Sequence, residues 1–198
     1  MKILFFVDLH GDMKALREIK ERANDDVDVV VCAGDFTTME RGMGDVLKEL
    51  NSLGKKVLMI HGNHEDEDGL REACENFENI LFIHKAVHHI GEYIFLGYGG
   101  DGFSTNDKSF ERVADEFFKH EALGKKRIIL VTHGPPHGTI LDDLGGDFRG
   151  NKSYKKFIDE VKPHVVVAGH LHENAGKHER VERTLYMNPG KNGVVLDI

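Results

Sequence analysis

Cysteine is scarce in this chain: Cys32 and Cys74 are the two present, and they form neither a disulfide framework nor a zinc-finger spacing. Long apolar runs are also lacking, because none approaches the roughly 18 residues of a membrane span. The apolar run after Lys2 ends at Asp8, which is too short for the hydrophobic region of a secretory signal. These absences favour a cytoplasmic protein with no membrane segment.

Basic residues are outnumbered by acidic ones. Lys and Arg number 26 against 34 Asp and Glu, which gives a formal net charge of −8. Proteins that coat nucleic acids or bind anionic membranes neutralise phosphates with clustered basic charge, so both classes are disfavoured. Proline is rare, with 4 residues, and 40% of the chain is hydrophobic, which excludes a collagenous or disordered chain. The length of 198 residues suits a full core, and we expect a single domain over 1–198.

Short β-branched runs alternate with amphipathic stretches along the chain. The apolar runs indicate buried strands at 2–7, 27–32, 56–60, 126–132 and 164–168. The amphipathic stretches indicate helices at 13–23, 44–53, 67–77, 108–123 and 152–161. We expect two hairpins, one joining 87–90 to 93–98 and one turning at 191–193 before 194–198. This alternation predicts an α/β fold with one or two layered sheets, whose ligands collect beyond the carboxyl ends of the strands.

Metal-ligand residue types follow all five expected strands, and histidine, with 13 residues, is abundant. The five segments are Asp8-Leu9-His10, Gly34-Asp35, Gly62-Asn63-His64-Glu65, His133 and Gly169-His170-Leu171-His172. Side chains two residues apart in extended backbone point the same way, so Asp8 and His10 can bind one ion. The two oxygens of Asp35 can bridge two cations. Carboxylate, amide and imidazole ligands suit Mn²⁺, Fe or Zn²⁺ better than Cu(I) or an Fe–S cluster.

In this combination the sequence resembles the calcineurin-like metallophosphoesterase superfamily, whose pattern is D-x-H, G-D, G-N-H-[DE], H and G-H-x-H. Four further segments resemble a small prokaryotic branch of Icc-like phosphoesterases. They are His133-Gly134-Pro135-Pro136, Gly150-Asn151-Lys152-Ser153, Phe157-Ile158-Asp159-Glu160 and Asn188-Pro189-Gly190. The resemblance implies a layered α/β/β/α sandwich in which mixed sheets are flanked by helices.

The resemblance also implies a role for each motif residue. The first metal ion would be held by Asp8, His10, Asp35 and His172. The second would be held by Asp35, Asn63, His133 and His170. His64 would stand near the leaving-group oxygen as a proton donor or polarising group, and Glu65 would orient His64 or a neighbouring turn. Two divalent cations are expected, with Mn²⁺ favoured and Fe, Ni²⁺, Co²⁺ or Zn²⁺ as alternatives, and a metal-activated hydroxide would attack the phosphorus.

Substrate contacts are expected from loops near these motifs. His137 lies close to His133 in the loop after Pro136, and Arg149, Asn151 and Lys152 precede a helix N-terminus, which is a natural anion site. The Gly-rich stretch 99–106 is either a substrate lid or a long connection. His61, before the Gly-Asn-His-Glu turn, is expected to pack rather than to bind metal.

The favoured interpretation is a phosphodiesterase that hydrolyses a small phosphodiester or a cyclic nucleotide. A phosphomonoesterase is the first alternative, although Arg41-Gly42 arrives two residues late for the G-D-x-x-D-R-G motif of the related serine/threonine phosphatases. A non-catalytic scaffold of the same fold, as in one retromer subunit, is the second, and the complete ligand set with His64 argues against it. A nuclease is disfavoured because the chain is acidic and has no basic tracks. The expected partner is a small phosphate ester, and the oligomeric state is left open.

Overall fold

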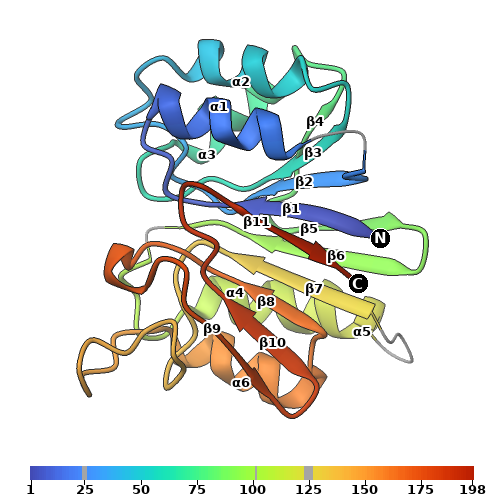
Figure 1. The fold of residues 1–198 in the computed structure, drawn as a ribbon. Coiled ribbons are helices and arrows are strands. Elements are labelled where there is room, and N and C mark those ends of the chain that lie inside the picture. Colours follow the sequence, from blue (N-terminus) through green and yellow to red (C-terminus); the bar gives the residue numbers. More distant parts are fainter. Residues whose placement is uncertain (24–25, 101, 123–126) are drawn as a thin grey trace.

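The structure is a computed structural model that describes residues 1–23, 26–100, 102–122 and 127–198. Two β-sheets lie face to face, and helices cover the outer face of each (Figure 1). The first half of the chain contains β1 (Lys2–Phe6), α1 (Met13–Arg22), β2 (Val29–Cys32), α2 (Met43–Asn51), β3 (Lys56–Met59), α3 (Glu67–Cys74) and β4 (Ile80–Phe82). The order of layers is therefore α/β/β/α, which confirms the predicted fold class.

The second half supplies the other sheet and its helices. Its elements are β5 (Ala86–Ile90), β6 (Tyr93–Tyr98), α4 (Lys108–Val113), a π-helical turn (Ala114–Phe118), α5 (Lys119–Ala122), β7 (Arg127–Thr132), α6 (Lys152–Val161), β8 (Val165–Val167), a 3₁₀ turn (His172–Asn174), β9 (His178–Val181), β10 (Thr184–Met187) and β11 (Val194–Asp197). The strand orders are β11-β1-β2-β3-β4 in the first sheet and β5-β6-β7-β8-β10-β9 in the second. Both sheets are mixed, because β11, β5 and β9 pair antiparallel with their neighbours whereas the inner strands pair in parallel.

The inner strands β1, β2, β3, β6, β7 and β8 are buried on both faces, which explains why they appear as continuous apolar runs. In β1, Ile3 and Phe5 pack between the two sheets, whereas Leu4 and Phe6 pack beneath the helices of the first half. This alternation follows from the two-residue period of a strand. Helix α1 contributes Leu16 and Ile19 to the outer cluster.

Most of the predicted elements are confirmed, with small shifts of their ends. The expected helix 108–123 is divided into α4, a π-helical turn and α5, and residue 123 lies outside the described residues, as does residue 126 of the expected strand 126–132. Asp12 caps α1 as predicted and accepts hydrogen bonds from the amides of Lys14 and Ala15 at 3.0 and 3.1 Å. The hairpin 87–90/93–98 is also present as β5 and β6.

The second predicted hairpin is wrong. Strand β11 does not fold back on the strand before it but crosses to the first sheet and pairs antiparallel with β1, with Lys2 opposite Asp197. The amide of Val7 donates to the carbonyl of Gly190 at 3.2 Å, which directs the chain toward the open edge of β1. The preceding strand, β10, pairs instead with β8 and β9.

The parallel strands place their carboxyl ends along one edge of the sandwich, on the left in Figure 1. The loops that follow β1, β2, β3, β7 and β8 therefore meet there. Among the described helices, none is long and apolar enough to cross a bilayer.

Candidate metal centre

The backbone bends sharply where the motif residues leave their strands. Asp8, His10, Asp35 and His170 all have positive φ, between 48° and 68°. Such angles are uncommon outside glycine and occur where the surrounding structure enforces them, often at functional sites. The bends turn these four side chains away from the strand direction and toward one another.

Gly34 allows two of these turns to touch. A Cβ built on Gly34 would lie 2.6 Å from the amide nitrogen of Gly62, so a larger residue would push the turn after β2 away from the turn after β3. Its φ of 94° also disfavours any residue with a side chain. The Gly-Asp and Gly-Asn-His-Glu motifs are thus interlocked through their backbones.

The first group of candidate ligands comprises Asp8, His10, Asp35 and His172. The Nε2 atoms of His10 and His172 lie 3.0 Å apart, and Asp35 Oδ2 lies 3.7 Å from His10 Nε2. Asp8 Oδ1 lies 3.9 Å from His172 Nε2. The four side chains predicted for the first metal therefore direct oxygen or nitrogen atoms into one small volume.

The second group comprises Asp35, Asn63, His133 and His170. Asn63 Oδ1 lies 2.9 Å from His170 Nδ1 and 3.1 Å from His133 Nε2. Asp35 Oδ2 also lies 3.4 Å from His133 Nε2, so Asp35 belongs to both groups. The Nδ1 atom of His133 lies 3.0 Å from the carbonyl of Ala33, and donating its proton there leaves Nε2 as the atom that can bind metal.

These residues fit a pair of divalent cations. Metal–ligand bonds of about 2.0–2.2 Å place neighbouring ligand atoms roughly 3–3.5 Å apart, close to the spacings seen here. The donor set of carboxylates, imidazoles and one amide suits a first-row divalent metal. Asp8, Asp35 and His133 are all buried, and two buried carboxylates need positive charge nearby.

The pKa values reflect that need for charge. Burial raises the pKa of Asp8, and neighbouring histidines only partly oppose the effect. Burial also acts against ionisation of Asp35, but the hydrogen bond and charge of His133 outweigh it and lower the Asp35 pKa to about 2. Asp35 in turn raises the pKa of His133 in spite of its complete burial. Asp35 is thus an anion at neutral pH, as a bridging ligand must be.

Glu65 fastens the two interlocked turns. Its side chain is buried and accepts hydrogen bonds from the amides of Asp35 and Gly62, both at 3.0 Å. It also accepts from the amide and hydroxyl of Thr37, at 2.9 and 2.7 Å. Of the two roles implied for Glu65, orienting a turn is the one that these contacts describe.

His64 stands beside the first group. Its ring centroid lies 4.7 Å from that of His10 at an interplanar angle of 86°, and its amide donates to Asp35 Oδ1 at 2.9 Å. The amide of Met39 donates to His64 Nδ1 at 3.3 Å. In the neutral ring the proton therefore resides on Nε2, which leaves an N–H available to a substrate oxygen.

A second histidine cluster, His61 and His84 with Glu67, shares no residue with the two ligand groups and has different chemistry. His84 Nε2 lies 3.2 Å from Glu67 Oε2, and the His61 and His84 ring centroids are 4.4 Å apart. The amide of Gly99 donates to His84 Nδ1 at 2.7 Å, which places the ring proton on Nε2 and blocks that atom as a ligand. Lys85 contributes a further cation, 2.8 Å from Glu67. This cluster therefore fits a packed ion pair rather than a metal site, and His61 lies buried in it as expected.

The predicted substrate-contact residues divide into two kinds. Asn151 is buried and caps α6: its Oδ1 accepts from the amides of Ser153 and Tyr154 at 2.9 and 3.2 Å, and its Nδ2 donates to the Ser104 carbonyl at 2.7 Å. These bonds use its polar atoms within the fold, so the expected anion site at this helix start is filled by Asn151 itself. The exposed Lys152 donates its amide to the Thr105 carbonyl at 2.7 Å.

Arg149 and His137 remain closer to open space. Arg149 Nε donates to Asp147 Oδ2 at 2.9 Å in an exposed ion pair. His137 Nδ1 lies 3.6 Å from the buried Asp142, which itself accepts from the amides of Gly138 and Gly150. The structure thus places His137 against the loop that leads to α6.

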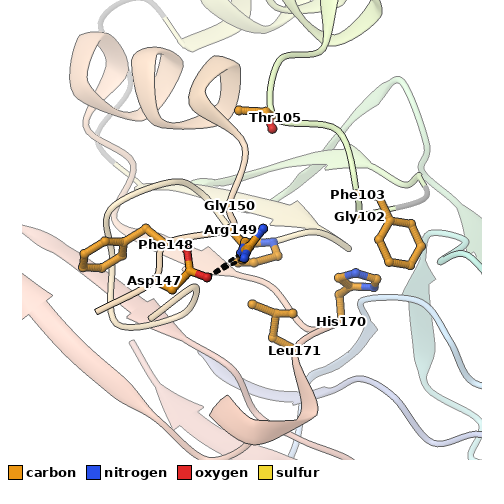
Figure 2. Close-up of a pocket in the computed structure, with 10 residues that line it drawn as sticks. Gly102, Phe103, Thr105, Asp147, Phe148, Arg149, Gly150, His170 and Leu171 are labelled. Atoms are coloured by element: carbon orange, nitrogen blue, oxygen red, sulfur yellow. Dashed lines mark hydrogen bonds and ion pairs between the residues drawn. The ribbon is translucent and has the colours of Figure 1, made fainter. Parts of the chain in front are cut away.

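Two cavities flank the candidate metal centre. One, of about 420 Å³, is lined by His170 and Leu171, by Gly102, Phe103, Thr105 and Pro135, and by residues 147–150 (Figure 2). The other, of about 490 Å³, is lined by Asp8, His10 and His172 and extends to Lys191. Both cavities are within the size range of small-molecule sites.

Comparisons with known proteins agree with this geometry. Residues 1–174 match the model of the calcineurin-like phosphoesterase family. An uncharacterised protein of Methanocaldococcus jannaschii is 31% identical over 218 aligned positions, which span 100% of this chain and 96% of that protein.

Solved structures show the same fold at low identity. A protein of Thermus thermophilus superposes with a TM-score of 0.78 at 16% identity, over 96% of this chain and 90% of its own. A dimetal phosphatase from Danio rerio has a TM-score of 0.67 at 11% identity, over 95% of this chain and 86% of its own. The chain belongs to the calcineurin-like phosphoesterase family of metal-dependent phosphoester hydrolases.

Proposed function

We propose that this protein is a dinuclear metal-dependent phosphodiesterase that hydrolyses a small diester. Asp8, His10, Asp35 and His172 would hold one ion, and Asp35, Asn63, His133 and His170 the other, with Mn²⁺ the favoured metal. When bound, the ions supply Lewis-acid stabilisation of the phosphoryl oxygens and a water of lowered pKa.

The observation that carries the choice of a diester is the pair of cavities on either side of the candidate centre. A diester has two organic groups on phosphorus, and one cavity borders His170 whereas the other borders His10 and His172. A monoester has only one such group. The arrangement thus matches the shape of a diester.

Charge supports the same choice. Each cavity has a single Lys or Arg among its described lining residues, and each is already paired: Arg149 with Asp147, and Lys191 with Asp12 at 2.9 Å. A monoester dianion at neutral pH gains from unpaired cations, whereas a diester carries one negative charge. The neutralised surroundings therefore favour the diester.

The residues of the chain would divide the remaining tasks. His64 would donate a hydrogen bond from Nε2–H to the leaving-group oxygen and polarise it, since the amide of Met39 donates to Nδ1 and so places the ring proton on Nε2. Asp35 would keep both ligand groups in register, and Glu65 would keep the two turns of Asp35 and Gly62 from separating. The scaffold alternative is disfavoured because a protein without activity has no need of two converging ligand groups and a properly oriented His64.

The test compares bis(p-nitrophenyl) phosphate with p-nitrophenyl phosphate in the presence of Mn²⁺, Ni²⁺, Co²⁺, Zn²⁺ or Mg²⁺ in turn. We expect a higher kcat/KM for the diester. A consistent preference for the monoester would reassign the protein as a phosphomonoesterase. No hydrolysis of either ester with any metal would favour the scaffold.

A further inference from the structure

The cavity beside His170 is assembled from four distant parts of the chain. Gly102, Phe103 and Thr105 follow β6, Pro135 follows β7, Asp147–Gly150 precede α6, and His170 and Leu171 follow β8. Figure 2 shows Phe103 and His170 on one side of this space and Arg149 on the other. The amide of Lys152 donates to Thr105, which ties the first segment to the start of α6. The walls are therefore joined to each other and lie directly next to a candidate ligand.

Phe103 is the apolar wall of this cavity. Its side chain is 71% exposed, whereas the large aromatic residues of the core are fully buried. Its ring meets the His170 ring edge to face, with centroids 4.5 Å apart and an interplanar angle of 86°. An aromatic ring positioned this way, next to a candidate metal ligand and open to solvent, offers a surface on which another planar ring can stack.

The opposite wall is polar but carries no net charge. Arg149 is bound to Asp147, so a second anion placed near the guanidinium would also face a carboxylate. The pair offers hydrogen-bond donors from Arg149 and acceptors from Asp147 side by side. This chemistry suits an uncharged polar group better than a second phosphate.

We propose that this cavity binds a planar heteroaromatic ring with both donors and acceptors, such as a nucleobase, stacked on Phe103. This inference rests on the proposed phosphodiesterase activity. The ring belongs to the substrate arm that stays on phosphorus, because His64, assigned to the leaving group, lies beside His10, which lines the other cavity. Phe103 is then a specificity residue, and Arg149 and Asp147 form hydrogen bonds with the polar atoms at the edge of the bound ring.

The test uses two diesters with the same leaving group. Methyl p-nitrophenyl phosphate has no ring on the retained arm, whereas the p-nitrophenyl ester of thymidine 5′-phosphate has a nucleobase there. We expect the wild type to favour the thymidine ester in kcat/KM. Phe103→Ala should raise KM for the thymidine ester by roughly 5- to 150-fold, the range for loss of one base–aromatic stack, and change kcat/KM for the methyl ester far less.

Phe148→Ala is the matched control. Phe148 is 42% exposed and lines the same cavity, but its ring points away from His170 in Figure 2. The ring centroids of Phe148 and His137 lie 6.1 Å apart. Because Phe148 lines the same cavity but does not face His170, we expect a much smaller rise in KM for the thymidine ester than in Phe103→Ala. An equal loss in Phe148→Ala and Phe103→Ala, or an equal loss with both esters in Phe103→Ala, would overturn the proposal.

Two further outcomes separate the inference from the proposed function. If the wild type hydrolyses both esters equally well and Phe103→Ala changes neither, the ring site is refuted and the phosphodiesterase stands. If the wild type hydrolyses no diester, the phosphodiesterase itself fails. If a 3′-phosphate on the thymidine increases kcat/KM and Arg149→Met removes that increase, the cavity is an anion site and the proposal is overturned.

Discussion

The molecule contains two clusters of histidine and carboxylate that share residue types but not chemistry. In the candidate metal centre, His133 turns its Nδ1 to the carbonyl of Ala33, which keeps Nε2 available as a ligand atom. In the other cluster, His84 turns its Nδ1 to the amide of Gly99, which puts the proton on Nε2. One backbone group thus decides whether a buried imidazole can bind a metal or can only donate a hydrogen bond.

Charge separates the two clusters as well. The centre holds two buried carboxylates, Asp8 and Asp35, with no Lys or Arg among the described groups that shift their pKa values. The other cluster holds one carboxylate, Glu67, that is bound by both Lys85 and Arg71. Burial opposes ionisation of Glu67, but the hydrogen bond from Lys85 and the other positive neighbours bring its pKa to about 2. Positive charge is therefore needed in the first cluster and already supplied in the second.

The largest expected effect comes from Asp35→Asn, which removes the carboxylate shared by both ligand groups. We expect the variant to lose metal at both sites and to lose at least about 10³-fold in kcat, since metal ions contribute several kcal/mol to the barrier. Elemental analysis and assay with bis(p-nitrophenyl) phosphate measure the two losses. Glu67→Gln is the matched control in the other cluster, and its metal content should equal that of the wild type.

His64→Ala should lower kcat by roughly 10²–10⁴-fold, the usual contribution of a positioned proton donor. Both metals should stay bound, because neither of the two proposed ligand sets includes His64. The loss should be greatest for poor leaving groups such as a nucleoside hydroxyl and least for p-nitrophenolate, which leaves without a proton. Loss of metal in this variant would show that His64 is a ligand.

Glu65→Gln should weaken metal binding indirectly, by loosening the turns that contain Asp35 and Gly62. Glutamine has one acceptor oxygen where Glu65 has two, so the amides of Asp35, Gly62 and Thr37 cannot all be satisfied. We expect metal affinity to fall by about 10- to 100-fold, as for other changes behind metal ligands. Titration calorimetry with Mn²⁺ measures the metal affinity of the variant and of the wild type. Glu49→Gln, which alters a half-buried ion pair with Lys20 outside the candidate metal centre, should leave the Mn²⁺ affinity unchanged.

The smallest expected effect is a pH dependence of folding stability that arises from His84 in the second histidine cluster. Burial lowers the pKa of His84 to about 3, so on acidification its ring is protonated first in the unfolded chain. Stability is therefore lost as pH falls below about 6.5, by up to about 1.4 kcal/mol per pH unit for this group. Denaturant unfolding between pH 7.5 and pH 5 should show a shallower pH dependence in His84→Gln than in the wild type. Equal slopes would mean that His84 is protonated in the folded protein as well.

The fold and the convergence of the candidate ligands could be predicted from the sequence, because both follow from short local patterns. A ligand such as Asp35 stands directly after its strand, and parallel strands bring such ends together without further information. Strand β11 could not be predicted in the same way, because its partner β1 lies at the other end of the chain.

The burial of Glu65 and the capping role of Asn151 could not be predicted from the surrounding sequence. Glu65 opens the run Glu65-Asp66-Glu67-Asp68, which is typical of a solvated helix start, and yet its partners Asp35 and Thr37 bury it. An Asn directly before a helix can either cap that helix or contact a bound anion, and the sequence does not distinguish the two roles. The structure does, because the side chain of Asn151 is bonded to the amides of Ser153 and Tyr154 and to the Ser104 carbonyl.

The most direct test of the central claim is an anomalous diffraction map of crystals loaded with Mn²⁺. We expect two peaks that share Asp35 as a ligand, one beside His10 and His172 and the other beside His133 and His170. We expect no peak at His61 and His84. A single peak, or a peak in the second histidine cluster, would contradict the assignment of the dinuclear centre.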